Sequence, residues 1–177
     1  MGLDITAYSK LESVDPLVQK VRQRLLVQDD ESEIYEFTPA HINSPNNRIG
    51  DMKPGKYYVT PATETLDFRA GSYSGYNTYR KMISECFLDA TQNEVWDNEK
   101  KFEGKPFYEQ VNFSDCEGFI GPEASVKLAG DYKEGRDQWY EYLRESGETQ
   151  IEYYMSKYDQ WTKAFGLASD GGFVWFC

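Results

Sequence analysis

Histidine and cysteine are scarce in this sequence of 177 residues, which contains one histidine and three cysteines. The single histidine, His41, excludes metal sites and acid–base mechanisms that require two histidines. Cys86, Cys116 and Cys177 form no CxxC pair, so they indicate neither a structural zinc site nor a disulfide framework. We therefore expect no metal ion and no cofactor, and a reducing compartment such as the cytoplasm.

Long apolar runs are also missing. A membrane-spanning helix requires about 18 consecutive apolar residues, and the sequence contains no such run. The first residues show no basic region followed by an apolar stretch, so they do not indicate a secretion signal. We expect no association with a membrane.

Basic residues are fewer than acidic ones. The sequence contains 19 Lys and Arg and 30 Asp and Glu, so the formal net charge is -11. A negative field of this size repels the phosphates of nucleic acids, so direct nucleic-acid binding is not expected. Aromatic residues, by contrast, make up 16% of the chain. Disordered chains contain few of them, so we predict a folded protein with one domain over residues 1–177.

Hydrophobic periodicity predicts an α+β fold. Leu3, Ile5 and Ala7 alternate with polar residues, as in a half-buried strand, whereas the apolar residues of 151–168 recur at helical spacing. The expected strands are 3–11, 32–37, 56–60, 64–70 and 173–177, and the expected helices are 15–26, about four turns from near Ser74, a segment from about 122, and 151–168. We expect a central mixed or antiparallel sheet that contains both the N- and C-terminal strands and is packed by three to four helices.

Some assignments stay open at this level. The strands at 56–60 and 64–70 form either a hairpin or two successive strands, and residues 139–143 either extend the helix from 122 or begin another. The charged segment 91–105 is expected to be a loop. Segment 38–55 is rich in Pro, Asn and Gly, and irregular segments of this length are often functional.

A glycine-rich turn at residues 71–75 separates an expected strand from an expected helix. Its backbone N–H groups, two serine hydroxyls and the helix N-terminus suit an anionic ligand, which Arg80 would assist. The turn lacks the spacing and the Lys of a P-loop, and the G-x-G-x-x-G dinucleotide pattern is also absent. The candidate ligand-binding residues are Gly71, Ser72, Tyr73, Ser74, Gly75, Tyr76, Asn77 and Arg80.

The same turn has a purely structural interpretation. Ser74 or Asn77 would cap the following helix, and the glycines would permit a positive φ in the turn. Tyr73 and Tyr76 offer stacking surfaces that a helix cap does not require, which is the argument for a ligand.

A second polar segment lies at residues 112–122, within apolar surroundings. Asp115 and Glu117 would suit a hard metal ion, or Cys116 would act as a nucleophile with His41 as its base. Asp and Gly are also ordinary turn residues, and Cys is often a small buried apolar residue. Asp115 and Glu117 join the candidate ligand-binding residues, whereas no catalytic residue and no metal ligand is assigned.

Four sequence blocks together resemble one known family. The blocks are MGLDITAYSKL, FRAGSYSGYNTYR, PFYEQVNFSDCEGFIGPEASVKLAGDY and YDQWTKAFGLASDGGFVWF. In order and spacing they look like uncharacterised accessory proteins of tailed bacteriophages and prophages. The resemblance implies expression in the cytoplasm of a bacterial host, among accessory genes of which some counter host defences. It implies no catalytic residue.

These observations lead to three functional hypotheses. The first is a phage or prophage accessory protein that binds a host bacterial protein or a small anionic ligand, without catalysis. The second is an enzyme or sequestering protein for a phosphorylated small molecule, which uses the 71–75 turn. The third is a structural protein of the virion. The oligomeric state is left open.

Overall fold

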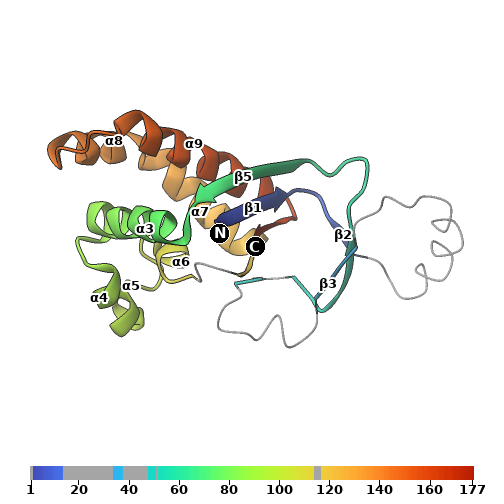
Figure 1. Ribbon diagram of the computed structural model, residues 1–177. Coiled ribbons are helices and arrows are strands. Elements are labelled where there is room, and N and C mark those ends of the chain that lie inside the picture. The colour runs from blue at the N-terminus through green and yellow to red at the C-terminus, as the bar shows by residue number, and fades with distance from the viewer. Residues whose placement is uncertain (1, 14–33, 38–47, 51, 114–116) are drawn as a thin grey trace, which may run out of the picture.

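The computed structural model describes residues 2–13, 34–37, 48–50, 52–113 and 117–177. It confirms the predicted α+β fold (Figure 1). The expected helix at 15–26, His41 and most of segment 38–55 lie outside the described residues.

The larger sheet has the strand order β5-β1-β7-β6, and each neighbouring pair is antiparallel. Its strands are β1 (Leu3–Tyr8), β5 (Thr65–Gly71), β6 (Gly118–Ile120) and β7 (Phe173–Phe176). The N- and C-terminal strands share this sheet, as predicted. They pair at its centre, where Asp4 and Cys177 exchange backbone hydrogen bonds of 2.9 and 3.0 Å. The alternation of β1 places Leu3, Ile5 and Ala7 in the core.

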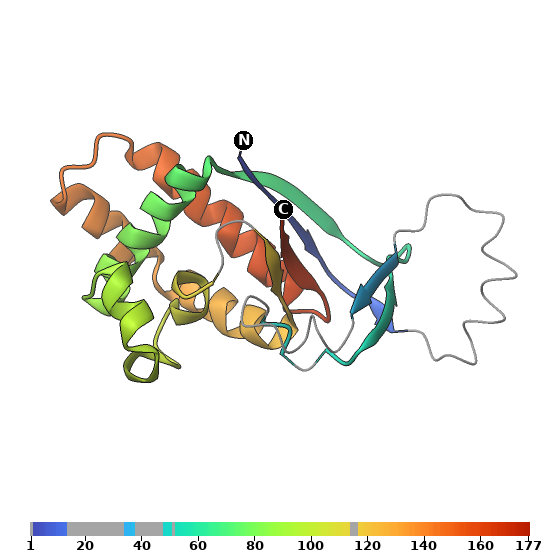
Figure 2. The same ribbon diagram turned by 60° about the horizontal axis from the view of Figure 1, so that its bottom comes forward.

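A smaller sheet has the order β2-β4-β3. Its strands are β2 (Glu12–Ser13), β3 (Ile34–Phe37) and β4 (Gly55–Tyr58). Figures 1 and 2 show it beyond one end of β1, away from the helices. The expected strands at 56–60 and 64–70 therefore correspond to β4 and β5, which belong to different sheets and do not form a hairpin.

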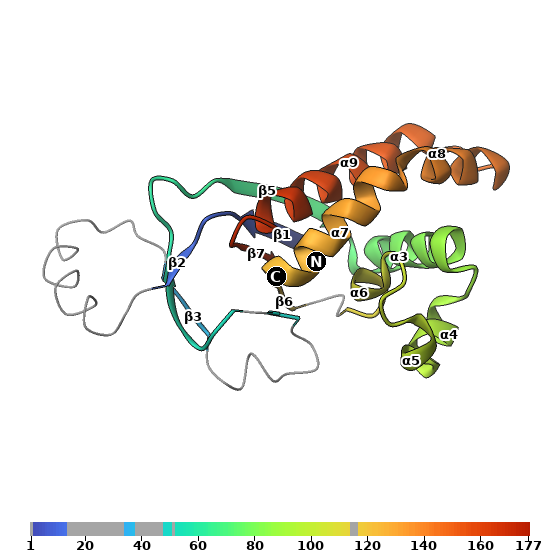
Figure 3. The ribbon, with the colours of Figure 1, turned by 180° about the vertical axis from the view of Figure 1, so that it is seen from behind.

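Three helices contact the larger sheet: α3 (Tyr73–Leu88), α7 (Pro122–Glu134) and α9 (Ile151–Ala168). Seen from behind in Figure 3, α7 and α9 lie side by side across it. Helix α8 (Arg136–Glu145) is separate from α7, and it packs on α3 and α9. The apolar stripe of α9 includes Tyr158, Trp161 and Phe165, all fully buried, which confirms its prediction as a core face.

The prediction of a loop at 91–105 was wrong. This segment contains α4 (Gln92–Asp97) and α5 (Glu99–Phe102), which precede the short α6 (Tyr108–Val111). Thr91 and Glu94 form a capping box. The carboxylate of Glu94 accepts hydrogen bonds from the backbone N–H and the hydroxyl of Thr91, and these two bonds lower the pKa of Glu94. Val95 and Phe102 are fully buried and anchor the two helices. The capping box and the two buried apolar residues are short signals, and they were missed in the sequence because many residues around them are charged.

A chain of polar groups crosses the aromatic core. The hydroxyls of Tyr79 and Tyr132 lie 3.1 Å apart, and Tyr132 donates to Oε1 of Gln110 at 2.6 Å. Tyr158 donates to the backbone oxygen of Tyr132 at 2.7 Å. Burial raises the pKa of Tyr79 and of Tyr132 well above the ordinary value, so both stay neutral and fix the packing of α3, α6, α7 and α9.

The described helices include none that is both long and apolar enough to span a membrane.

Candidate functional site

The 71–75 turn is held by its own hydrogen bonds. Ser72 is the N-cap of α3, because its Oγ accepts from the backbone N–H of Gly75 at 3.0 Å. The hydroxyls of Ser72 and Ser74 also lie 3.0 Å apart. The prediction that Ser74 or Asn77 caps the helix was wrong, since α3 already begins at Tyr73. The cap must precede the first helical residue to reach the free N–H groups of the first turn.

Arg80 lies inside the protein and ties α3 to the end of α6. Its side chain is 2% exposed, donates to the backbone oxygen of Phe113, and donates to Oδ1 of Asn77 at 2.9 Å. The guanidinium carbon lies 5.0 Å from the ring centre of Tyr76 and 5.8 Å from that of Trp96. Tyr76 itself is fully buried. The Arg80 and Tyr76 side chains therefore have structural contacts that the sequence did not reveal.

The two predicted polar regions meet at Phe113, whose carbonyl accepts from Arg80. Asp115 and Cys116 lie outside the described residues, and Glu117 is exposed. Within the part of the chain that is described, no three His, Cys, Asp or Glu side chains are grouped to hold a metal ion. Ligand binding by residues 71–80 and by Asp115 and Glu117 stays a prediction.

The cap at Ser72 gives a direct stability test. Replacing Ser72 with alanine leaves the N–H of Gly75 without its acceptor, and we expect the free energy of unfolding to fall by about 1 kcal/mol. Ser74→Ala is the matched control, because among the described residues the Ser74 hydroxyl forms a hydrogen bond only with that of Ser72, and its change should stay within about 0.5 kcal/mol. Urea unfolding followed by circular dichroism measures both. Equal losses in the two variants would contradict the assignment of the cap.

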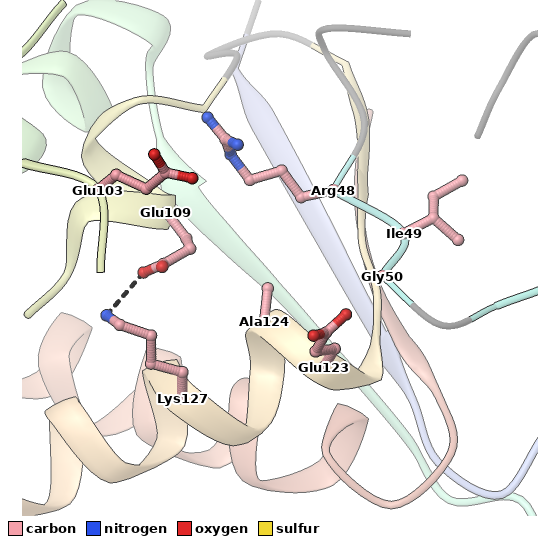
Figure 4. Close-up of a pocket in the computed structure, with 8 residues that line it drawn as sticks. All are labelled: Arg48, Ile49, Gly50, Glu103, Glu109, Glu123, Ala124 and Lys127. Atoms are coloured by element: carbon pink, nitrogen blue, oxygen red, sulfur yellow. Dashed lines mark hydrogen bonds and ion pairs between the residues drawn. The ribbon is translucent and has the colours of Figure 1, made fainter. Parts of the chain in front are cut away.

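A separate cleft lies on the described surface. Its volume is about 510 Å³, which falls in the range of small-molecule sites. We call it the Arg48 cleft, and Figure 4 shows the side chains that line it: Arg48, Ile49, Gly50, Glu103, Glu109, Glu123, Ala124 and Lys127.

Backbone pairing positions one side of the cleft. The N–H of Arg48 donates to the oxygen of Phe119 at 2.9 Å, and the N–H of Gly121 donates to the oxygen of Arg48 at 2.8 Å. Residues 48–50 thus lie along the outer edge of β6, directly before α7. Gly121 is required here, because a Cβ on it would lie 2.6 Å from the carbonyl carbon of Ile49.

Lys127 fixes the opposite wall. Its ammonium group donates to the backbone oxygen of Lys105 at 2.7 Å, and it contacts Glu109 and Asp131 at 2.7 and 2.8 Å. The side chain of Lys127 is 30% exposed and those of its two acidic partners are 16% exposed. Because all three donors of Lys127 are used, its charge is balanced within the protein.

Three other charges at the cleft are not balanced in this way. The carboxylates of Glu103 and Glu123 make no hydrogen bond or ion pair with any described residue. The side chain of Arg48 makes one long hydrogen bond within the described part of the chain, 3.4 Å to the oxygen of Asn112, and its guanidinium carbon lies 5.5 Å from the ring centre of Tyr108. Its Nε is buried and has no acceptor among the described residues. In Figure 4 the only drawn pair joins Glu109 to Lys127.

Few features of the sequence indicate the Arg48 cleft. Arg48 belongs to segment 38–55, whose length alone indicated a functional role. Glu103 lies in the segment predicted as a loop, and Glu123 and Lys127 read as ordinary charged positions on a helix. No motif joins them, because three separate parts of the chain supply them.

No protein-family model, no curated protein and no solved structure matches this chain. The functional argument therefore depends on the chemistry and geometry of the described residues.

Proposed function

We propose that this chain is a binding protein that recognises a host bacterial protein or a small ligand through the Arg48 cleft. The observation that carries this proposal is the set of unbalanced charges of Arg48, Glu103 and Glu123 around one cavity of about 510 Å³. The buried Nε of Arg48 has no acceptor among the described residues, which costs free energy, so a ligand that supplies an acceptor to this guanidinium gains affinity. Glu103 and Glu123 are exposed, and they add charge complementarity for a cationic group.

The cellular setting in this proposal comes from the sequence. The blocks that resemble tailed-phage and prophage accessory proteins favour a protein made by a phage or prophage in the bacterial cytoplasm. Binding is the mode of action that suits such a protein best, since Arg48 can recognise an anionic group and Glu103 and Glu123 can recognise cationic groups.

A second candidate is the sequestration of a phosphorylated small molecule at the 71–75 turn. Its support is the exposure of Ser72 and Ser74 at the first turn of α3, where backbone N–H groups favour an anion. Loss of phosphate-dependent stabilisation in Ser74→Ala would identify this site.

The proposal is tested by a thermal-shift screen of host metabolites and short peptides. A ligand at a hundredfold excess over Kd stabilises a protein by about 2.7 kcal/mol, which raises Tm by about 5 to 10 °C at this chain length. We expect Glu123→Lys to abolish the shift, whereas Glu134→Lys, at the far end of α7, should keep it. Both glutamates are exposed, so both variants should fold.

Two results would count against this function. In one, every stabilising compound acts equally on the wild type and on Glu123→Lys. In the other, no compound or peptide stabilises the wild type at all. Recovery of a bound compound in chemically altered form would show turnover and would replace binding by catalysis.

A further inference from the structure

We propose that the ligand of the Arg48 cleft is a basic α-amino acid, which carries one carboxylate and two cationic groups. This inference rests on the proposed function and identifies its ligand class. Among the described residues, the cleft presents one unbalanced positive charge, from Arg48, and two unbalanced negative charges, from Glu103 and Glu123. A basic amino acid is the small molecule whose charges complement this set one by one.

Arg48 is suited to the carboxylate. Its planar guanidinium presents N–H donors in a fork that matches the two oxygens of a carboxylate. Tyr108 lies against this group at 5.5 Å, which restricts its orientation. The single long bond to Asn112 leaves the remaining donor capacity for a ligand.

The surroundings of Arg48 favour a carboxylate over a phosphate. Two unpaired glutamates line the same cleft, and the whole chain has a formal net charge of -11. A phosphate brings more negative charge into this field than a carboxylate does, and it brings no cation to balance the glutamates. A ligand with a net charge of zero or above is therefore preferred.

Glu103 and Glu123 are suited to two separate cationic groups. Glu103 directly follows α5, whereas Glu123 lies in the first turn of α7, and Figure 4 shows them on opposite sides of the cleft. Carboxylates that are separated in this way do not surround one metal ion, but they match the α-ammonium and the side-chain cation of one amino acid. The methyl group of Ala124, which also lines the cleft, offers an apolar contact for the methylene stem.

Isothermal titration calorimetry with four probes tests this assignment. The probes are L-lysine, L-arginine, cadaverine, which is lysine without its carboxylate, and L-norleucine, which lacks the side-chain ammonium. The titrations are run at an ionic strength of about 0.01 M, where charges are weakly screened. We expect lysine or arginine to bind, and cadaverine and norleucine to bind about tenfold more weakly or not at all.

Two variants separate recognition of the carboxylate from that of the cations. Arg48→Met should weaken lysine binding about tenfold and remove the difference between lysine and cadaverine. Glu123→Gln should lower the affinity for lysine more than the affinity for norleucine. Glu134→Gln, outside the Arg48 cleft, should leave every affinity unchanged.

Three outcomes would overturn the proposal. In the first, the wild type binds cadaverine and lysine with equal affinity. In the second, Arg48→Met binds lysine as tightly as the wild type does. In the third, the wild type binds neither lysine nor arginine. If another compound binds in a manner that depends on Glu123 while lysine and arginine do not, the ligand class is wrong and the proposed function stands. If no compound binds through Glu123, both are wrong.

Discussion

Gly121→Ala is expected to lower the free energy of unfolding by about 2 to 4 kcal/mol and to abolish binding at the Arg48 cleft. The added Cβ would lie 2.6 Å from the carbonyl carbon of Ile49 and 2.9 Å from its Cα. The backbone angles of Gly121, φ -82° and ψ -175°, suit alanine, so the cost arises from this collision alone. Relief requires residues 48–50 to move away from β6, which breaks two backbone hydrogen bonds and displaces Arg48.

Gly130→Ala is the matched control on the same helix. Nothing lies within 4 Å of the position where its Cβ would be, and Gly130 lies inside α7. Alanine favours the helix over glycine there, so we expect a gain of about 0.5 to 1 kcal/mol and unchanged binding. Urea unfolding and ligand titration measure both variants. If Gly121→Ala is as stable as the wild type, residues 48–50 do not pack closely against Gly121 at the edge of β6.

Arg80→Ala should cause the second large loss, about 3 to 4 kcal/mol in the free energy of unfolding. The substitution leaves a cavity beside Tyr76 and Trp96 and removes the donor to the buried carbonyl of Phe113. Arg80→Lys should recover only part of the loss, because an ammonium group lacks the planar fork that reaches both Phe113 and Asn77.

Arg136→Ala provides the comparison for Arg80. Arg136 is exposed and pairs with Asp159 at 3.1 and 3.3 Å, and a surface ion pair contributes at most about 1 kcal/mol. Unfolding in guanidinium chloride ranks the losses in the free energy of unfolding of Arg80→Ala, Arg80→Lys and Arg136→Ala. If Arg80→Ala is as stable as the wild type but loses binding of an anion, Arg80 serves a ligand, as the sequence suggested, and not the core.

The parts of the fold that the sequence predicted have strong local patterns. The helix Ile151–Ala168 has the predicted bounds because its apolar residues repeat at helical spacing and glycines follow it. Pro122 marks the first residue of α7. The N-terminal strand follows from the alternation of Leu3, Ile5 and Ala7 with polar residues, and the C-terminal strand follows from a short apolar run. The two helices of segment 91–105 were missed because their capping box and buried anchors are short signals within a charged sequence.

The candidate sites show where local patterns stop being informative. The 71–75 turn was visible because its glycines and serines are adjacent. By contrast, the contact of Arg80 with the carbonyl of Phe113, across 33 positions, has no local signature. The Arg48 cleft is even harder to predict from the sequence, since its formation depends on residues 48–50 pairing with the edge of β6. Such a contact depends on the tertiary fold, and a single sequence does not display it.

The pairing of β1 with β7 has a consequence for synthesis on the ribosome. Residues 3–8 leave the exit tunnel long before residues 173–176, which pair with them in the sheet. The larger sheet therefore stays incomplete at its centre, and not at an edge, until residues 173–176 have been translated. Until β7 is made, one edge of β1 has no partner strand, and an unpaired edge is a place where another chain can pair, so we expect chaperones to shield it.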